Sequence, residues 1–140
     1  MLLNTGNNIQ YSNSGLLTTV AYKNKGKTFY ALEGSSYIAG AAVQWLRDNL
    51  NIINDSCEVE NLANQVTSLE EMKHLLFLPF FTGIGSPYWK ADAKAAIVGM
   101  TRDTSNAHLA KACLDGICFS INDLINAMKK DTNSSLSTLK

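Results

Sequence analysis

The sequence predicts a mixed α/β fold, because segments with strand patterns alternate with segments that have helical periodicity. Three patterns indicate this class: two strand-like segments over residues 16–32, a helical apolar pattern over 38–50, and a strand that leads into a long amphipathic helix over 95–128. The 140-residue length is ordinary for one domain, and the 46% hydrophobic content suits a folded globular chain.

The first third of the chain is predicted to form an antiparallel meander. Residues 16–22 are rich in Leu, Thr and Val, and residues 28–32 alternate polar and apolar side chains. Gly26 lies between them and can take the positive φ of a bulged hairpin turn. Residues 1–4 are expected to be a third strand, joined through the turn-like segment 6–8.

Helices are predicted in the middle of the chain. The first is expected to have Ser35 or Ser36 as its cap. Asp55 and Glu58 fit a variant capping box, which predicts a short helix over 58–66, and residues 70–73 suggest one further helical turn. The first helix is identified by its apolar positions, which recur every three or four residues: Ile38, Ala39, Ala42, Val43, Leu46 and Leu50.

The second half begins with a short apolar run over 75–78, which predicts a buried strand. Residues 81–89 are loop-like because of their glycines and proline, and residues 95–100 have a strand pattern. A long helix is expected to begin near Thr104 or Ser105, and the polar segment after Lys130 is expected to fray. The helix has an apolar stripe: Leu109, Cys113, Leu114, Ile117, Ile121, Leu124 and Met128.

Composition excludes several classes of function. Twelve basic residues balance twelve acidic ones, which argues against nucleic-acid binding. No apolar run is long enough to span a membrane and the N-terminus does not resemble a signal peptide, so we expect a cytoplasmic location. The three cysteines form no CxxC pair and are expected to be reduced, with Cys113 and Cys118 buried as small hydrophobic residues.

The chain contains no complete set of catalytic residues. His74 and His108 have no Cys, Asp or Glu beside them at metal-ligand spacing, and surface or capping roles are commoner for such histidines. Motifs for zinc proteases, serine hydrolases and phosphate loops are absent, and no pair of carboxylates stands out. The sequence therefore assigns neither a catalytic nor a metal-binding residue to this chain.

Two features could form a binding surface. Gly40 and Gln44 are four residues apart on a predicted helix, so a side-chain-free notch would lie one turn from an amide. Glycine within a helix costs about 1 kcal/mol, which requires a reason, and from the residues alone close packing is commoner than a binding site. The Tyr88-Trp89 pair after Gly83 and Gly85 would either line a cleft or lie in the core.

Considered together, the segments resemble the glycerol kinase branch of the FGGY family of carbohydrate kinases. They occur in the family's order and extend over nearly the whole chain. Residues 30–34 and 44–48 are more specific to that branch than to the sugar kinases. The matching segments are residues 1–6, 15–19, 30–34, 39–48, 81–89 and 95–102, followed by Asn106, His108 and Leu114.

The resemblance implies an incomplete C-terminal kinase domain over residues 1–140, part of the nucleotide-binding half of an actin-like ATPase (ribonuclease H-like) fold. That fold has a mixed sheet with flanking helices. The implied reaction is phosphorylation of glycerol or a related polyol to glycerol 3-phosphate, with ATP and Mg²⁺. Gly40 and Gln44 match positions where the family contacts ATP or ADP, so the resemblance favours a nucleotide site at the notch.

The sequence departs from the family pattern at two positions. Cys113 replaces a small or β-branched residue, and Lys90 stands where the family usually has Asp. In the family pattern the catalytic Asp and a phosphate-binding Gly-Thr-Gly turn lie upstream of Met1, and an Asp-Gly-Gly segment follows Lys140. We therefore expect the isolated chain to be inactive and to function with the remaining kinase segments. The alternative is a non-enzymatic interaction module, or the product of a decayed gene, that associates with itself or a partner through unpaired strands.

Overall fold

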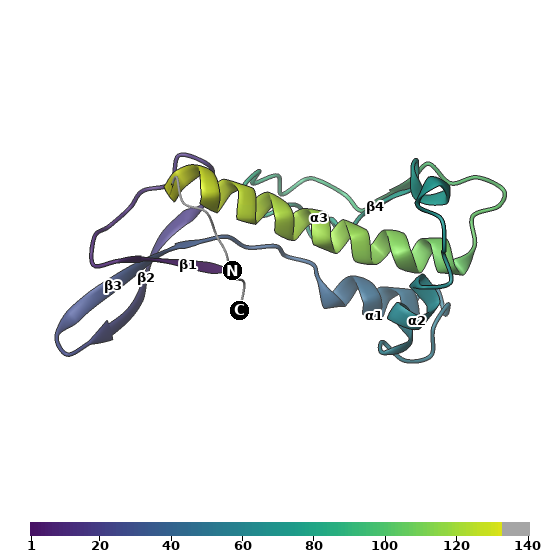
Figure 1. Cartoon of the computed structure of the whole chain (residues 1–140), viewed down its shortest axis with the longest axis horizontal. Coiled ribbons are helices and arrows are strands. Elements are labelled where there is room, and N and C mark those ends of the chain that lie inside the picture. The colour runs from purple at the N-terminus through teal and green to yellow at the C-terminus, as the bar shows by residue number, and fades with distance from the viewer. Residues whose placement is uncertain (133–140) are drawn as a thin grey trace. The chain divides into compact units, whose positions relative to one another are not determined.

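The computed structural model describes residues 1–132 of the chain (Figure 1). Helices and strands alternate along the sequence, so the predicted α/β class is confirmed. The described residues form two compact units. Unit 1 contains residues 1–36, 84–90 and 120–132, and unit 2 contains residues 37–83 and 91–119.

Unit 1 contains a three-stranded sheet formed by β1 (Leu2–Gly6), β2 (Leu17–Asn24) and β3 (Lys27–Glu33). Its order is β1-β3-β2, with β3 antiparallel to both neighbours, so the predicted meander is wrong in its strand order. The reason is burial: Ala31 and Leu32 of β3 are buried, whereas β1 and β2 contribute no buried residue. The most buried strand therefore takes the central position. The second sheet is also antiparallel, so the mixed sheet that the resemblance implied does not form within residues 1–132.

The β2–β3 hairpin has a tighter turn than the sequence predicted. Asn24 pairs with Lys27, which leaves only Lys25 and Gly26 in the turn, with φ values of 46° and 80°. Two positive φ values identify the two-residue turn that best matches the twist of a hairpin. An irregularity in the register does occur, but it lies within β2, between Val20 and Tyr22.

One face of this sheet packs against the C-terminal half of α3 (Asn106–Thr132). Leu32 and Leu124 are at the centre and almost inaccessible to water. The cluster joins residues that are nearly a hundred positions apart in the sequence, so α3 is essential to the core of unit 1. Its buried members are Leu16, Leu32, Leu124, Ala127 and Met128, with Met1 and Leu3 packed against them.

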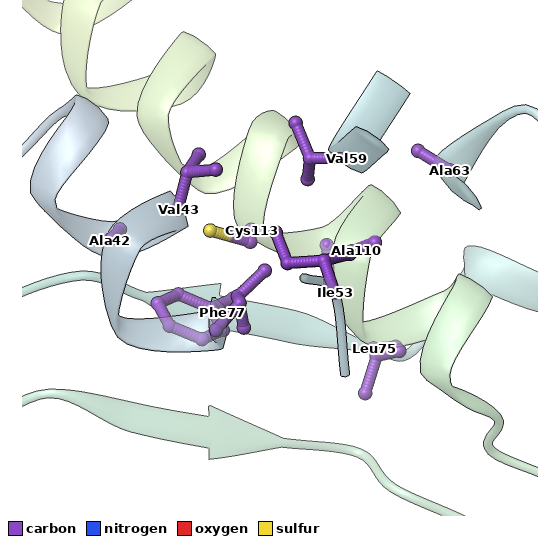
Figure 2. Close-up of a cluster of buried hydrophobic side chains, with 11 residues drawn as sticks. Ala42, Val43, Ile53, Val59, Ala63, Leu75, Phe77, Ala110 and Cys113 are labelled. Atoms are coloured by element: carbon purple, nitrogen blue, oxygen red, sulfur yellow. The ribbon is translucent and has the colours of Figure 1, made fainter. Parts of the chain in front are cut away.

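Unit 2 has its own hydrophobic core, which is shown in Figure 2. It lies between α1 (Gly40–Asp48), α2 (Glu58–Ala63), the N-terminal half of α3 and a two-stranded sheet of β4 (Leu76–Leu78) and β5 (Ala96–Val98). Val43, Phe77 and Cys113 come from three different elements and meet in this cluster (Figure 2). The run over 75–78 is buried on one face only, since Leu76 is 46% exposed.

Short helices in unit 2 begin where local hydrogen bonds allow them. The Asp55 carboxylate accepts from the Cys57 N–H at 2.9 Å, and Glu58 accepts from the Asn54 N–H at 2.9 Å. The predicted capping box is wrong, because the N-cap residue of α2 is Cys57 and no side chain caps it, and the helix ends at Ala63 rather than at residue 66. Asp55 and Glu58 instead hold the turn that precedes the helix. The expected helical turn near residue 70 is the 3₁₀ helix η1 (Leu69–Met72), and the Ser68 hydroxyl accepts from the Glu70 N–H.

The buried stripe of α3 differs from the prediction because small residues provide much of it. Leu109, Leu114, Ile117 and Ile121 are only half-buried, whereas several alanines and Gly116 are fully buried. Cys113 is buried, and burial raises the pKa of its thiol to about 11. The prediction for Cys118 is wrong, since it is exposed. Five residues correspond to about 140° around a helix, so the two cysteines cannot share a face.

The end of α3 does not fray immediately after Lys130. The helix continues to Thr132, and Asp131 accepts hydrogen bonds from the Ser12 hydroxyl at 2.5 Å and the Asn13 N–H at 3.1 Å. Asp131 therefore fixes the loop that leads into β2. The rest of the segment expected to fray, residues 133–140, lies outside the described residues.

We expect Asp131→Ala to destabilise the chain by about 1–2 kcal/mol at pH 7, since it removes hydrogen bonds to a charged group. Burial raises the pKa of Asp131, but the hydrogen bonds from Ser12 and Asn13 outweigh it, so the net pKa lies below 3.8. The stabilisation is therefore present above the unfolded pKa and is lost as the pH falls through the lower folded pKa. Urea unfolding between pH 7 and pH 3 should show the variant converging on the parent in acid. Asp92→Ala, at an exposed loop position, should change little.

Candidate functional site

The N-terminus of α1 is an exposed helix end without a side-chain cap. Gly40 is the first helical residue and Ala39 is the N-cap residue, with no side chain accepting a hydrogen bond there. The prediction of a Ser35 or Ser36 cap is therefore wrong. Ser35 instead pairs through its backbone with Ser86, donating to the Ser86 hydroxyl at 3.3 Å and accepting from the Ser86 N–H at 3.1 Å.

Gly40 and Gln44 both lie on the exposed surface of α1, one turn apart. A Cβ atom placed on Gly40 would have nothing within 4 Å among the described residues, so the glycine faces open space. The close packing that was the commoner explanation for this glycine is therefore not present in residues 1–132. Gly40 also lies at the start of the helix, where glycine costs less stability than in the helix interior.

The electrostatics of this helix end favour an anionic or hydrogen-bond-accepting ligand. Among residues 1–132, no acceptor pairs with the N–H groups of Gly40 and Ala41. The first turn of α1 has no acidic residue, and the charged residues Arg47 and Asp48 pair with each other at the opposite end. The partial positive charge of the helix dipole is therefore not neutralised at Gly40.

The opposite face of α1 fixes the helix in unit 2. Ala42, Val43 and Leu46 are buried, at the spacing that places them on one face. Trp45 lies beside this face, with its ring centre 5.9 Å from that of Phe77 and 5.1 Å from that of Phe81. The exposed pair therefore lies on a rigid element, which is what a binding surface requires.

The loop over residues 84–90 is well ordered by hydrogen bonds within unit 1. The Trp89 indole N–H donates to the Gly15 carbonyl at 2.7 Å, and the Tyr88 hydroxyl donates to Asp123 at 3.0 Å. Both side chains remain about half exposed, so they are not placed in the core. Their role in lining a cleft stays a prediction.

The two histidines lie in different surroundings. His74 is exposed. His108 lies in the first turn of α3, where its Nδ1 accepts from the Ser105 N–H at 3.1 Å and its Nε2 lies 3.1 Å from the Glu71 carboxylate. This is the capping arrangement expected at a helix start. An open pocket of about 450 Å³ lies beside His108, lined by Glu71, Thr101, Asp103, Thr104 and His108, and none of these comes from α1.

No group of three or more His, Cys, Asp or Glu side chains that could hold a metal ion occurs within residues 1–132. All three cysteines are free thiols.

None of the helices in the described part of the chain has both the length and the apolar content needed to cross a membrane.

Comparison with known sequences identifies one family along the whole chain. Residues 1–140 match the model of the C-terminal domain of the FGGY family of carbohydrate kinases. The chain is 46% identical over 140 residues to glycerol kinase of Acinetobacter baylyi, and 49% identical over 141 residues to glycerol kinase of Mycobacterium tuberculosis H37Rv. All of the chain is covered in both cases, but only 28% and 27% of the relatives. The chain thus spans just over a quarter of their length.

Solved structures give the same result for the fold. A Plasmodium falciparum glycerol kinase, crystallised with ADP, superposes with a TM-score of 0.83 and 36% sequence identity, over 96% of this chain and 26% of that one. A gluconate kinase of Lactobacillus acidophilus superposes with a TM-score of 0.75 and 25% identity, over 96% and 26% of the two chains. The described units therefore have the arrangement of elements found in these kinases.

Proposed function

The chain belongs to the FGGY family of carbohydrate kinases, and we propose that it forms one wall of the nucleotide-binding cleft of a glycerol kinase. The corresponding reaction is transfer of the terminal phosphoryl group of ATP to glycerol, which gives glycerol 3-phosphate. Because the chain spans about 27% of its relatives, the remaining parts of the cleft and the polyol site would come from other segments of the kinase.

The open notch at Gly40 is the observation that supports this proposal. An aromatic base can approach the helix backbone at Gly40, where no described atom lies within 4 Å of a Cβ position. The exposed Gln44 amide can then donate to and accept from the edge of the base or the ribose. The similar Plasmodium falciparum kinase was crystallised with ADP, which shows that a protein with this arrangement of elements takes a nucleotide.

Phosphoryl transfer also needs groups that this proposal does not assign to the chain. Such reactions depend on a base for the attacking hydroxyl and on positive charge near the transferred phosphate. Mg²⁺ beside a nucleotide is usually held by phosphate oxygens, water and one or two carboxylates, and no residue of this chain is assigned as such a ligand. Gly40 and Gln44 would bind and orient the nucleotide, and the chemical step would depend on the remaining kinase segments.

We expect Gly40→Val to lower the affinity for ADP at least about tenfold, a loss of roughly 1.4 kcal/mol, because the new side chain fills the notch. Titration of the ¹⁵N-labelled chain with ADP, followed by amide chemical shifts, would measure this affinity. The shifts should be largest at residues 40–44. Gln44→Ala should weaken binding less, since it removes hydrogen bonds but leaves the notch open.

Ala41→Val is the matched control for that measurement. It places the same branched side chain at the next exposed position of the same helical turn, but about 100° around the helix. Equal losses in the two valine variants would contradict a specific role for Gly40, as would ADP-induced shifts confined to other segments.

The purified chain mixed with ATP and glycerol should give no glycerol 3-phosphate. Clear turnover would contradict the expectation that the catalytic base lies outside the chain.

A further inference from the structure

Three side chains of unit 2 lie in a row at the start of α3, and helix capping alone does not explain them. The Ser105 hydroxyl is 2.7 Å from Nδ1 of His108, and Nε2 of the same ring is 3.1 Å from the Glu71 carboxylate. Glu71 comes from η1, 37 positions away from His108. A hydroxyl, an imidazole and a carboxylate in this order are the groups of an activated serine nucleophile, here with the two ring nitrogens exchanged relative to the usual triad.

The hydroxyl of Ser105 is not used to cap the helix. A serine before a helix usually accepts a hydrogen bond from an N–H group of the first turn. Within residues 1–132, no backbone N–H donates to the Ser105 hydroxyl, and the N–H of Ser105 itself donates to Nδ1 of His108 at 3.1 Å. The imidazole therefore holds both groups of Ser105. Because Ser105 is exposed, a substrate can reach its hydroxyl.

The surroundings of Ser105 fit attack of its hydroxyl on a carbonyl group. The N–H groups of Asn106 and Ala107 have no acceptor among residues 1–132, and they lie at the positive end of the helix dipole. In serine hydrolases, the N–H of the residue after the nucleophile stabilises the oxyanion at such a helix start. The open pocket of about 450 Å³ beside His108 has room for a small ester. Its two carboxylates favour a neutral or cationic ester over an anionic one.

We propose that Ser105, His108 and Glu71 form a hydrolytic site for small carboxylic esters. Oγ of Ser105 bonds to the carbonyl carbon while its proton passes to Nδ1 of His108, and the carbonyl oxygen takes the electron pair beside the Asn106 N–H. The bond to the alcohol oxygen then breaks, this oxygen takes the proton from His108, and the acyl group stays on Ser105. Water attacks the acyl carbon and gives a proton to His108, which returns it to Ser105 as the acid leaves. Glu71 is a positioning residue, because it fixes the ring through Nε2.

Hydrolysis of p-nitrophenyl acetate by the purified chain tests the proposal. The exposed thiols of Cys57 and Cys118 are first alkylated, so that they do not react with the ester. Ser105→Asn should lower the rate at least about tenfold, because asparagine can still cap the helix but is no nucleophile. Ser68→Asn is the matched control, since Ser68 also precedes a helix but its hydroxyl accepts from the Glu70 N–H. That control should keep the parent rate.

Labelling with a fluorophosphonate gives a second measurement. Mass spectrometry should locate the label on Ser105, and His108→Gln should abolish it, because the amide cannot take the proton of the hydroxyl. Glu71→Gln should lower kcat for the ester with little change in KM, since Glu71 orients the base and does not bind the substrate. Glu70→Gln is its control on the same 3₁₀ helix, where Glu70 pairs with Lys73, and it should change neither constant.

Three results would overturn the proposal: hydrolysis by Ser105→Asn at the parent rate, a fluorophosphonate label that does not appear on Ser105, or equally fast labelling of Ser105 in His108→Gln. Circular dichroism confirms that each variant is folded before these comparisons are made. Every variant should bind ADP as the parent does, because no residue of α1 belongs to this site. Failure of the ester site therefore leaves the proposed nucleotide site unaffected.

Discussion

Gly116→Ala is expected to destabilise the chain by about 3 kcal/mol or more, because the added methyl group has no space. A Cβ atom on Gly116 would lie 2.2 Å from the carbonyl oxygen of Phe77, which is backbone and cannot rotate away. Relief requires β4 to move away from α3, which would separate Phe77 from the core of unit 2 (Figure 2). Urea unfolding followed by the indole N–H resonance of Trp45 would measure the loss, since this side chain packs against Phe77.

Gly40→Ala is the matched control, because it makes the same change at another helical glycine. Its Cβ atom would have nothing within 4 Å among the described residues. Alanine also favours helix over glycine by up to about 1 kcal/mol, so this variant should be neutral or slightly more stable. Similar losses in both variants would show that the close approach of β4 to α3 is not what Gly116 is needed for.

The two glycines show what the sequence alone could predict about α3 and α1. Apolar spacing was enough to predict that a long helix begins near residue 105, as observed. The packed side of that helix was harder to identify, because Ala110, Ala112 and Gly116 carry little apolar area. At Gly116 the backbone of β4 approaches the helix closely, and β4 is distant in the sequence.

Strand order was a different kind of failure. Each of the three N-terminal strands was predicted close to its observed position, since alternation and turn residues are local signals. The position of β3 between the other two depends on which strand loses most water-accessible area, and that is decided by packing against α3. For the same reason the role of Asp131 could not be predicted, because its partners lie about 120 residues away.

The candidate site was predicted in part from local spacing. A four-residue separation on a helix was enough to place Gly40 and Gln44 on one face. Whether the notch would be filled by a neighbour depended on tertiary structure, and the structure leaves it open within residues 1–132. The uncapped N–H groups at the start of α1 were missed because two nearby serines suggested an earlier start for the helix. The position of Gly40 was the available signal for the observed start of the helix.

Leu124→Ala should cost about 2–5 kcal/mol, the usual range for removing a fully buried leucine side chain. Leu124 is 1% exposed and lies at the centre of the cluster that joins the sheet of unit 1 to α3. Its side chain also packs close to Gly34, where even a Cβ atom would approach it to 2.9 Å. The surrounding backbone is held by strand pairing, so the cavity left by the substitution should collapse only partly.

The two tryptophans allow this loss to be assigned to one unit. Trp89 belongs to unit 1 and Trp45 to unit 2, so their indole N–H resonances report on the units separately. Under urea, Leu124→Ala should lose the Trp89 signal at a lower concentration than the parent chain does. Phe119→Ala, which removes a large side chain from a 57% exposed position of the same helix, should cost no more than about 0.5 kcal/mol. An unchanged Trp89 midpoint in Leu124→Ala would contradict the role of α3 as the core element of unit 1.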